Sequence, residues 1–136
     1  MSQSQLSFLY VEDDPASRTI MLVMLRKILG YQNVTIFNDS TNFIERLAAL
    51  PTVPDLFLLD INVGPTNGTD LLRLIRARPD YNLSKVVAVT ASVTTSEVNS
   101  LKQAGFDALI GKPIKQAVFA QLIDQIVSGS PVWMVP

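Results

Sequence analysis

The stretch DLFLLDINVGPTNG, residues 55–68, is the part of the sequence from which the fold is best predicted. Its apolar run, residues 56–59, has the length and composition of a buried strand and leads directly to the carboxylate of Asp60. The loop that follows is rich in Gly, Pro and Asn, as expected where a parallel strand leaves a sheet. Asp60 is therefore a candidate functional group, and its role depends on which other residues reach the same edge of the sheet.

Four other short apolar runs resemble residues 56–59, and amphipathic segments separate them. The five expected strands are residues 6–11, 34–37, 56–59, 86–89 and 108–110. The last amphipathic segment has the clearest helical stripe, formed by Val118, Phe119, Leu122, Ile123 and Ile126. Parallel neighbours need right-handed crossovers, so this alternation predicts a doubly wound α/β fold, a five-stranded parallel sheet with five helices on both faces.

Short polar motifs predict where several helices begin. Asp14 before Pro15 is expected to cap the first helix, which assigns it to the helix and not to a site. Asp39 and Ser40 are the cap candidates for the second helix. Thr94 and Glu97 match a capping box, with Gly105 placed to end that helix.

Length and composition favour one compact domain. Of the 136 residues, 48% are hydrophobic and 17% are charged, which argues against disorder. We expect the domain to span residues 6–128. An apolar tail, residues 129–136, follows it and carries Trp133, and we expect this tail to pack on the domain or to mediate self-association, which leaves a homodimer open.

Charge and residue usage exclude several classes of function. With 11 Lys and Arg against 12 Asp and Glu, the net charge is −1, so no basic field for nucleic acid is expected. The sequence has no Cys and no His, which leaves carboxylates as the main metal ligands and favours a hard cation. Residues 1–5 lack a basic signal-peptide region, and no apolar run approaches the roughly 20 residues that span a bilayer. We therefore expect no membrane association and a cytoplasmic location.

Residues with charged or hydroxyl side chains follow four of the five expected strands. Because the carboxyl ends of parallel strands meet at one edge of the sheet, they should converge there. The set is Glu12, Asp13, Asp60, Thr90 and Lys112. Clustered carboxylates need a cation to offset their repulsion, and oxygen ligands without His or Cys suit Mg²⁺. An Asp carboxylate can attack phosphorus, while a hydroxyl and an ammonium can position phosphoryl oxygens.

This arrangement resembles the receiver domain of two-component response regulators over nearly the whole chain, residues 6–128. The matching pieces are the acidic pair Glu12-Asp13, the acceptor Asp60 with Gly68 eight residues later, Thr90-Ala91 and Lys112-Pro113. The resemblance implies the flavodoxin-like strand order 2-1-3-4-5. It also implies a signalling protein that assists its own phosphorylation and dephosphorylation, and not a conventional enzyme.

The resemblance implies roles for these residues. Asp60 would accept a phosphoryl group from a histidine kinase or a histidine phosphotransfer protein, and Thr90 and Lys112 would contact that group. The residues implied to hold Mg²⁺ are Asp13, Asp60, the backbone carbonyl of Asn62 and, through water, Glu12. With no output domain in the sequence, a stand-alone receiver would signal by phosphorylation-dependent binding to a downstream protein.

The sequence departs from the family pattern at three positions. Leu109 replaces the aromatic residue that accompanies the threonine's movement in the family. Gly64, with Pro65 after it, replaces the usual proline in the loop after the acceptor, and Gly111 adds freedom before Lys112. A non-switching interaction module is therefore the alternative. A nucleotide- or flavin-binding domain is a third, but no Gly-rich phosphate loop follows any expected strand.

Overall fold

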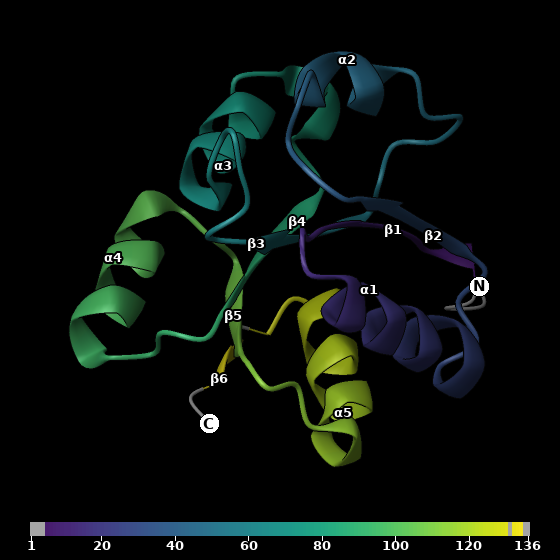
Figure 1. The fold of residues 1–136 in the computed structure, drawn as a ribbon, viewed down its shortest axis with the longest axis vertical. Coiled ribbons are helices and arrows are strands. Elements are labelled where there is room, and N and C mark those ends of the chain that lie inside the picture. Colours follow the sequence, from purple (N-terminus) through teal and green to yellow (C-terminus); the bar gives the residue numbers. More distant parts are fainter. Residues whose placement is uncertain (1–4, 131, 135–136) are drawn as a thin grey trace.

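The computed structural model describes residues 5–130 and 132–134, which are built around one sheet of parallel strands (Figure 1). The order of the strands across the sheet is β2-β1-β3-β4-β5-β6. Their bounds are Ser7–Val11 (β1), Asn33–Phe37 (β2), Leu56–Asp60 (β3), Lys85–Thr90 (β4), Ala108–Gly111 (β5) and Val132–Met134 (β6). The predicted parallel α/β fold and the order 2-1-3-4-5 are confirmed.

The sixth strand is a difference from the five-stranded prediction. Val132 to Met134 pair in parallel with Ala108 to Ile110 of β5. Val132 is only 6% exposed, and Trp133 is half-buried, so both apolar side chains leave water when the segment joins the sheet. Part of the tail thus completes the sheet edge, while residues 131, 135 and 136 of the tail lie outside the described residues.

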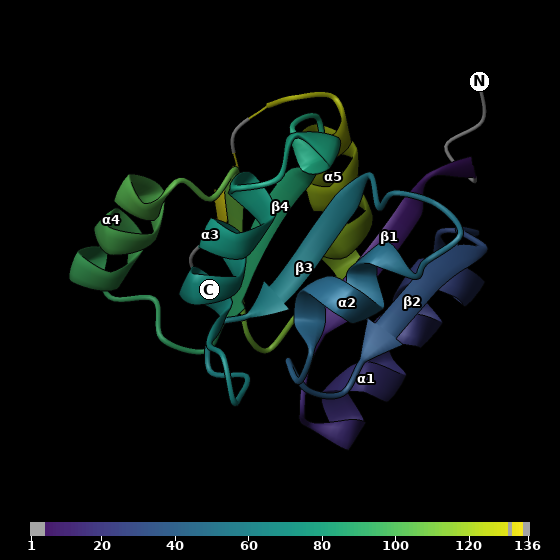
Figure 2. The same ribbon diagram turned by 90° about the horizontal axis from the view of Figure 1, so that it is seen from above.

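Helices cover both faces of the sheet. The helical bounds are Pro15–Leu22 (α1), Phe43–Ala48 (α2), Gly68–Arg76 (α3), Thr95–Ala104 (α4) and Gln116–Val127 (α5), with a π-helical segment at Val23–Ile28 (η2) and a 3₁₀ turn at Pro79–Tyr81 (η3). The segment formed by α1 and η2 packs with α5 on one face, and α2, α3 and α4 pack on the other (Figures 1 and 2).

The two-sided covering explains the apolar runs within the inner strands. In β1, Phe8 and Tyr10 belong to the core beneath α1 and α5, whereas Leu9 and Val11 belong to the core on the other face. All four are at most 1% exposed. Since successive strand residues point to opposite faces, a strand buried on both sides needs an apolar residue at every position.

The capping residues predicted for α1 and α4 are confirmed, and the one predicted for α2 is not. Asp14 accepts a hydrogen bond from the Ser17 backbone N–H, and Thr94 accepts one from that of Glu97. The expected cap of α2 at Asp39 or Ser40 is wrong, because the cap position is Asn42, in the left-handed region with φ of 49°. Asp39 instead accepts from the Thr41 N–H and forms an ion pair with Arg46, which makes a turn before the helix begins.

The first helix also ends differently from a simple α-helix. After Leu22 it continues as the π-helical segment η2, and the Leu29 N–H donates to the Met24 carbonyl. Gly30, at φ of 80°, then reverses the chain toward β2.

Among residues 5–130 and 132–134, no helix combines the length and apolar character that crossing a membrane requires.

Candidate functional site

Asp60 is the last residue of β3 and lies between two parallel neighbours. Leu59 pairs with Val11 of β1, and Asp60 pairs with Val89 of β4. The residue after Val11 is Glu12, whose own N–H donates to the Phe37 carbonyl of β2. The register therefore brings the end of β1 beside the end of β3, as the sequence predicts.

Three carboxylates gather at this edge of the sheet. Glu12, Asp13 and Asp60 each offer one carboxylate oxygen, and these oxygens lie within 4.8 Å of one another. The side chains differ in burial, since Glu12 is 0% exposed, Asp60 is 5% exposed and Asp13 is exposed to solvent. The cluster is thus a shallow acidic site with two buried members and one open side.

Lys112 supplies the positive charge of the site. Its ammonium Nζ lies 2.6 Å from Glu12 Oε1 and 3.8 Å from Asp60 Oδ1. The Lys112 backbone N–H donates to the Thr90 carbonyl at 2.8 Å, which ties the end of β5 to the end of β4. Lys112 therefore connects the acidic cluster to two neighbouring strand ends.

Tyr10 is a member of this network that the sequence analysis missed. Its hydroxyl donates to Glu12 Oε1 at 2.6 Å, and the side chain is 0% exposed. The sequence predicts Tyr10 only as part of the apolar strand at residues 6–11. The missed signal is its position two residues before Glu12, because residues i and i+2 of a strand point to the same face.

The buried charges shift each other's protonation. Burial, reinforced by the neighbouring Glu12 carboxylate, raises the pKa of Asp60 to about 6, and Lys112 opposes this only in part. Burial also acts to raise the pKa of Glu12, but hydrogen bonds from Lys112 and Tyr10 outweigh it and hold that pKa below its ordinary value. Glu12 is therefore the anion that Lys112 neutralises, and within the part of the chain that the structure describes Asp60 has no cationic partner as close.

Thr90 and Asn62 both lie close to Asp60. Thr90 is the last residue of β4, one position beyond the partner of Asp60, and its hydroxyl accepts a hydrogen bond from the Ser92 N–H. The Asn62 N–H donates to Asp60 Oδ1 at 3.3 Å. The structure thus brings Glu12, Asp13, Asp60 and Lys112 into one cluster, with Thr90 and Asn62 at its border.

Gly68 allows α3 to begin against the end of β3. Its N–H donates to the Ile61 carbonyl, and a Cβ at this position would lie 2.9 Å from the Asp60 carbonyl oxygen and 2.9 Å from the Ile61 Cα. Both atoms belong to the backbone, so neither can rotate away. Only glycine fits this close approach.

The loop after Asp60, residues 61–67, is anchored to the opposite connection. Ser40 Oγ donates to the Thr66 carbonyl and accepts from the Thr66 N–H, both at 2.7 Å. The Ser40 N–H donates to the Gly64 carbonyl at 3.0 Å. The Gly64–Pro65 and Lys112–Pro113 peptide bonds are cis. Ser40, expected as a helix cap, instead orders the loop beside the site.

Comparison with protein families matches residues 8–124 to the response regulator receiver domain. This match covers most of the chain and agrees with the strand order and the acidic edge. The chain belongs to the response regulator receiver family.

Relatives of this receiver domain occur in proteins of different architecture. It is 27% identical over 128 residues to Stress response regulator protein 1 of the yeast Meyerozyma guilliermondii, covering 93% of this chain and 58% of that protein. It is 26% identical over 131 residues to the signal transduction histidine-protein kinase BarA of Escherichia coli, covering 96% of this chain and 14% of that protein. The chain therefore spans only part of the relatives it matches.

Solved receiver domains share the fold. The receiver domain of a DNA-binding response regulator from Colwellia psychrerythraea matches with a TM-score of 0.79 at 22% identity, covering 91% of this chain and 99% of that one. The receiver domain of the sensor histidine kinase PA1611 from Pseudomonas aeruginosa matches with a TM-score of 0.77 at 27% identity, covering 90% and 98%. That second structure has a magnesium ion coordinated in its active site cleft.

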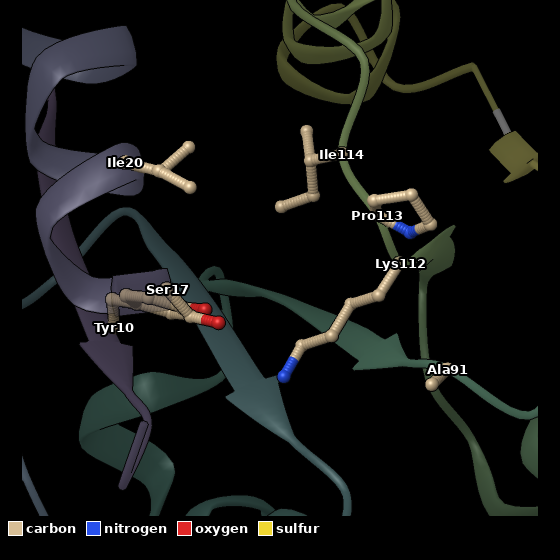
Figure 3. A pocket seen from close by; sticks show the side chains of 7 residues that line it. All are labelled: Tyr10, Ser17, Ile20, Ala91, Lys112, Pro113 and Ile114. Atoms are coloured by element: carbon tan, nitrogen blue, oxygen red, sulfur yellow. The ribbon is translucent and has the colours of Figure 1, made fainter. Parts of the chain in front are cut away.

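A groove of about 350 Å³ opens beside Lys112 in this receiver domain (Figure 3). It lies between α1 and the connection from β5 to α5. Ile20 and Ile114 face each other across it, and the Lys112 side chain extends along it. Ile20 is 53% exposed, so an apolar surface borders the acidic site.

Proposed function

We propose that Asp60 is the phosphoacceptor of this receiver domain and takes its phosphoryl group from a phosphohistidine. An Asp60 carboxylate oxygen attacks phosphorus, the P–O bond forms as the P–N bond breaks, and the imidazole leaves with the electron pair and takes up a proton. The observation that carries the proposal is the position of Asp60 at a strand end, in a carboxylate cluster with Lys112 Nζ 3.8 Å away.

The donor set fits Mg²⁺. Glu12, Asp13 and Asp60 present only oxygen ligands, and burial together with the neighbouring Glu12 carboxylate raises the pKa of Asp60, which a bound cation would offset. Asp13, Asp60 and the backbone carbonyl of Asn62 would bind the ion directly, and Glu12 through water. When bound, Mg²⁺ would offset the charge of the acidic cluster and of the incoming phosphoryl group. The magnesium ion in the PA1611 receiver supports this assignment by analogy.

Lys112 and Thr90 would contact the transferred group. The Lys112 ammonium already lies between two carboxylates, so a phosphoryl group on Asp60 would compete with Glu12 for it. Thr90 can donate its hydroxyl proton to a phosphoryl oxygen, because that hydroxyl acts only as acceptor toward the Ser92 N–H. Both residues position the group and offset its charge, which is most of what phosphoryl transfer requires of a protein.

The partners follow from the chemistry and from the relatives. A histidine kinase or a histidine phosphotransfer protein would supply the phosphoryl group, and a downstream protein would recognise the altered surface. A kinase and a response regulator are both among the similar proteins, which supports a phosphorelay role. The stand-alone character and cytoplasmic location expected from the sequence stay predictions, as does the homodimer.

Treatment with a small-molecule phosphodonor and Mg²⁺ tests this function. We expect an acid-stable, base-labile phosphate on the protein, abolished in Asp60→Asn and retained in Asp124→Asn, which removes an exposed carboxylate on α5. Absence of phosphate from the wild type, or equal labelling of the Asp60→Asn variant, would contradict the proposal.

A non-switching interaction module is the second candidate. It is favoured by Leu109, which is 0% exposed on β5 in place of the aromatic residue implied by the family pattern. In that case the partner would bind equally with and without a phosphoryl mimic on Asp60. A difference in affinity would exclude this candidate.

A further inference from the structure

The added strand β6 joins the edge of the strand that leads to Lys112. Leu109 of β5 pairs with Trp133, and β5 continues through Gly111 to Lys112. Gly111 in turn pairs with Thr90. A displacement at the end of β4 would therefore act on β5, and Trp133 is paired to β5.

Trp133 also contacts α4. Its ring packs against the core on the α4 face, and Lys102 Nζ of α4 lies 5.1 Å from the ring centroid. On the opposite face, Val132 belongs to the core beneath α5. Through these two side chains, β6 links the edge of β5 to helices on both faces of the sheet.

Few buried side chains hold α4 in place. Val98 and Leu101 are its buried residues, and Figures 1 and 2 both show the helix at the margin of the fold. Only the short connection 91–94 separates Thr90 from the first residue of α4. The contact between Lys102 and Trp133 therefore adds to the packing of Val98 and Leu101 in fixing this helix. The helix is also directly connected to the site.

We propose that β6 is a restraining strand: through Trp133 it holds α4 and β5 in the unphosphorylated arrangement, and phosphorylation of Asp60 releases it. The proposal rests on the phosphoacceptor function proposed above. A phosphoryl group adds about two negative charges at Asp60, which draws the Lys112 ammonium away from Glu12 and engages the Thr90 hydroxyl. Both movements act on strand ends that lead to Trp133, one through β5 and the other through α4.

Release of β6 and binding of a phosphoryl group or its mimic at Asp60 must then be coupled in both directions. If occupying the site weakens the docking of β6 by some factor, undocking of β6 must strengthen binding at the site by the same factor. Removing Trp133 favours undocking, so it should strengthen binding by up to that factor. The leucine at position 109 fits this arrangement, because the indole of its strand partner lies in the same core cluster. The aromatic group next to α4 is thus provided by β6 and not by β5.

Titration with Mg²⁺ and beryllofluoride, a phosphoryl mimic, tests the coupling, with bound fluoride followed by ¹⁹F NMR. We expect Trp133→Ala to bind the mimic about fivefold tighter than the wild type. Lys102→Met, which leaves the core untouched, should shift the affinity in the same direction. Leu83→Ala, at a residue 96% exposed in the loop before β4, is the matched control and should bind as the wild type does.

The fluorescence of Trp133, the only Trp in the sequence, gives a second required result. Its emission in the wild type should move to longer wavelength when the mimic binds, and should stay constant in Asp60→Asn. Equal or weaker binding by Trp133→Ala, or unchanged wild-type emission at saturation, would overturn the restraining role while leaving the phosphoacceptor function intact. Failure of the wild type to bind the mimic would overturn both.

Discussion

At the scale of single residues, Asp60 has an environment that suits a nucleophile better than it suits stability. It is nearly inaccessible and lies beside Glu12, and the Lys112 ammonium is closer to Glu12 than to Asp60. Ionising Asp60 therefore costs more free energy in the folded protein than in the unfolded chain. The same isolation leaves its carboxylate available to a cation and to phosphorus.

The pH dependence of stability should reveal this cost. The pKa of Asp60 is raised from its ordinary value of 3.8 to about 6, so its favourable contribution is complete below pH 3.8 and is lost as the pH rises through about 6. Without metal, Asp60→Asn should raise the free energy of unfolding by about 3 kcal/mol at pH 8 and by less than about 1 kcal/mol at pH 4. Urea denaturation measures both values, and an equal effect at the two pH values would contradict this account.

Tyr10 should stabilise the buried Glu12 anion. Removing its 2.6 Å hydrogen bond in Tyr10→Phe should lower the free energy of unfolding by about 2 kcal/mol at pH 7. In a double-mutant cycle with Glu12→Gln, the two effects should be clearly non-additive, since the residues share one contact. Additive effects would mean that the hydroxyl does not support the carboxylate.

Replacing Gly68 by alanine should change the stability in the opposite direction from that expected from helix propensity. Alanine is ordinarily better than glycine in a helix by about 1 kcal/mol. Here its Cβ would lie 2.9 Å from the backbone at Asp60 and Ile61, so Gly68→Ala should destabilise the protein by about 2 kcal/mol and slow phosphorylation. Gly64→Ala is the control for urea denaturation and phosphate incorporation, because among the described residues no atom beyond its chain neighbours lies within 4 Å of the added Cβ. Equal stabilities would show that no close approach exists.

At the scale of elements, the helix starts differ in what stabilises them. Asn67 caps α3 by accepting the Asp70 N–H at 2.9 Å, whereas Asn42 begins α2 in a left-handed conformation without a side-chain cap bond. The first arrangement depends on the side chain and the second on backbone conformation. The two asparagines should therefore respond to substitution differently.

Asn67→Ala should lower the free energy of unfolding by about 1 kcal/mol, because the cap acceptor is lost. Asn42→Gly should change it little or raise it slightly, because glycine adopts a φ of 49° without strain. Thermal denaturation of both variants measures the difference. The interpretation is wrong if Asn42→Gly is the more destabilised of the two.

At the scale of the whole molecule, the sequence predicted what depends on repeated patterns. Strands buried on both faces must be apolar throughout, so their positions and the parallel sheet could be read directly. Asp60 and Lys112 each follow such a strand, which is why their meeting at one edge could be predicted as well. The roles of these residues in phosphoryl transfer stay predictions.

Features that depend on tertiary contacts could not be read this way. The strand β6 contains only three residues, too few for a periodic pattern, and forms because the edge of β5 is available. The π-helical segment η2 follows α1 without a break, so a helical pattern in the sequence does not separate the two. Tyr10 looked like a core residue because its apolar ring hides the role of its hydroxyl. Asn42 gave no cap signal because its backbone, and not its side chain, begins α2.

The central claim is that Asp60 carries the phosphoryl group, and chemical trapping tests it most directly. Borohydride reduces an aspartyl phosphate to homoserine, which peptide mass spectrometry locates in the sequence. After treatment with a small-molecule phosphodonor and Mg²⁺, we expect homoserine at position 60, and none when the phosphodonor is omitted. Homoserine at a different aspartate, or its absence from position 60 after phosphodonor treatment, would contradict the account.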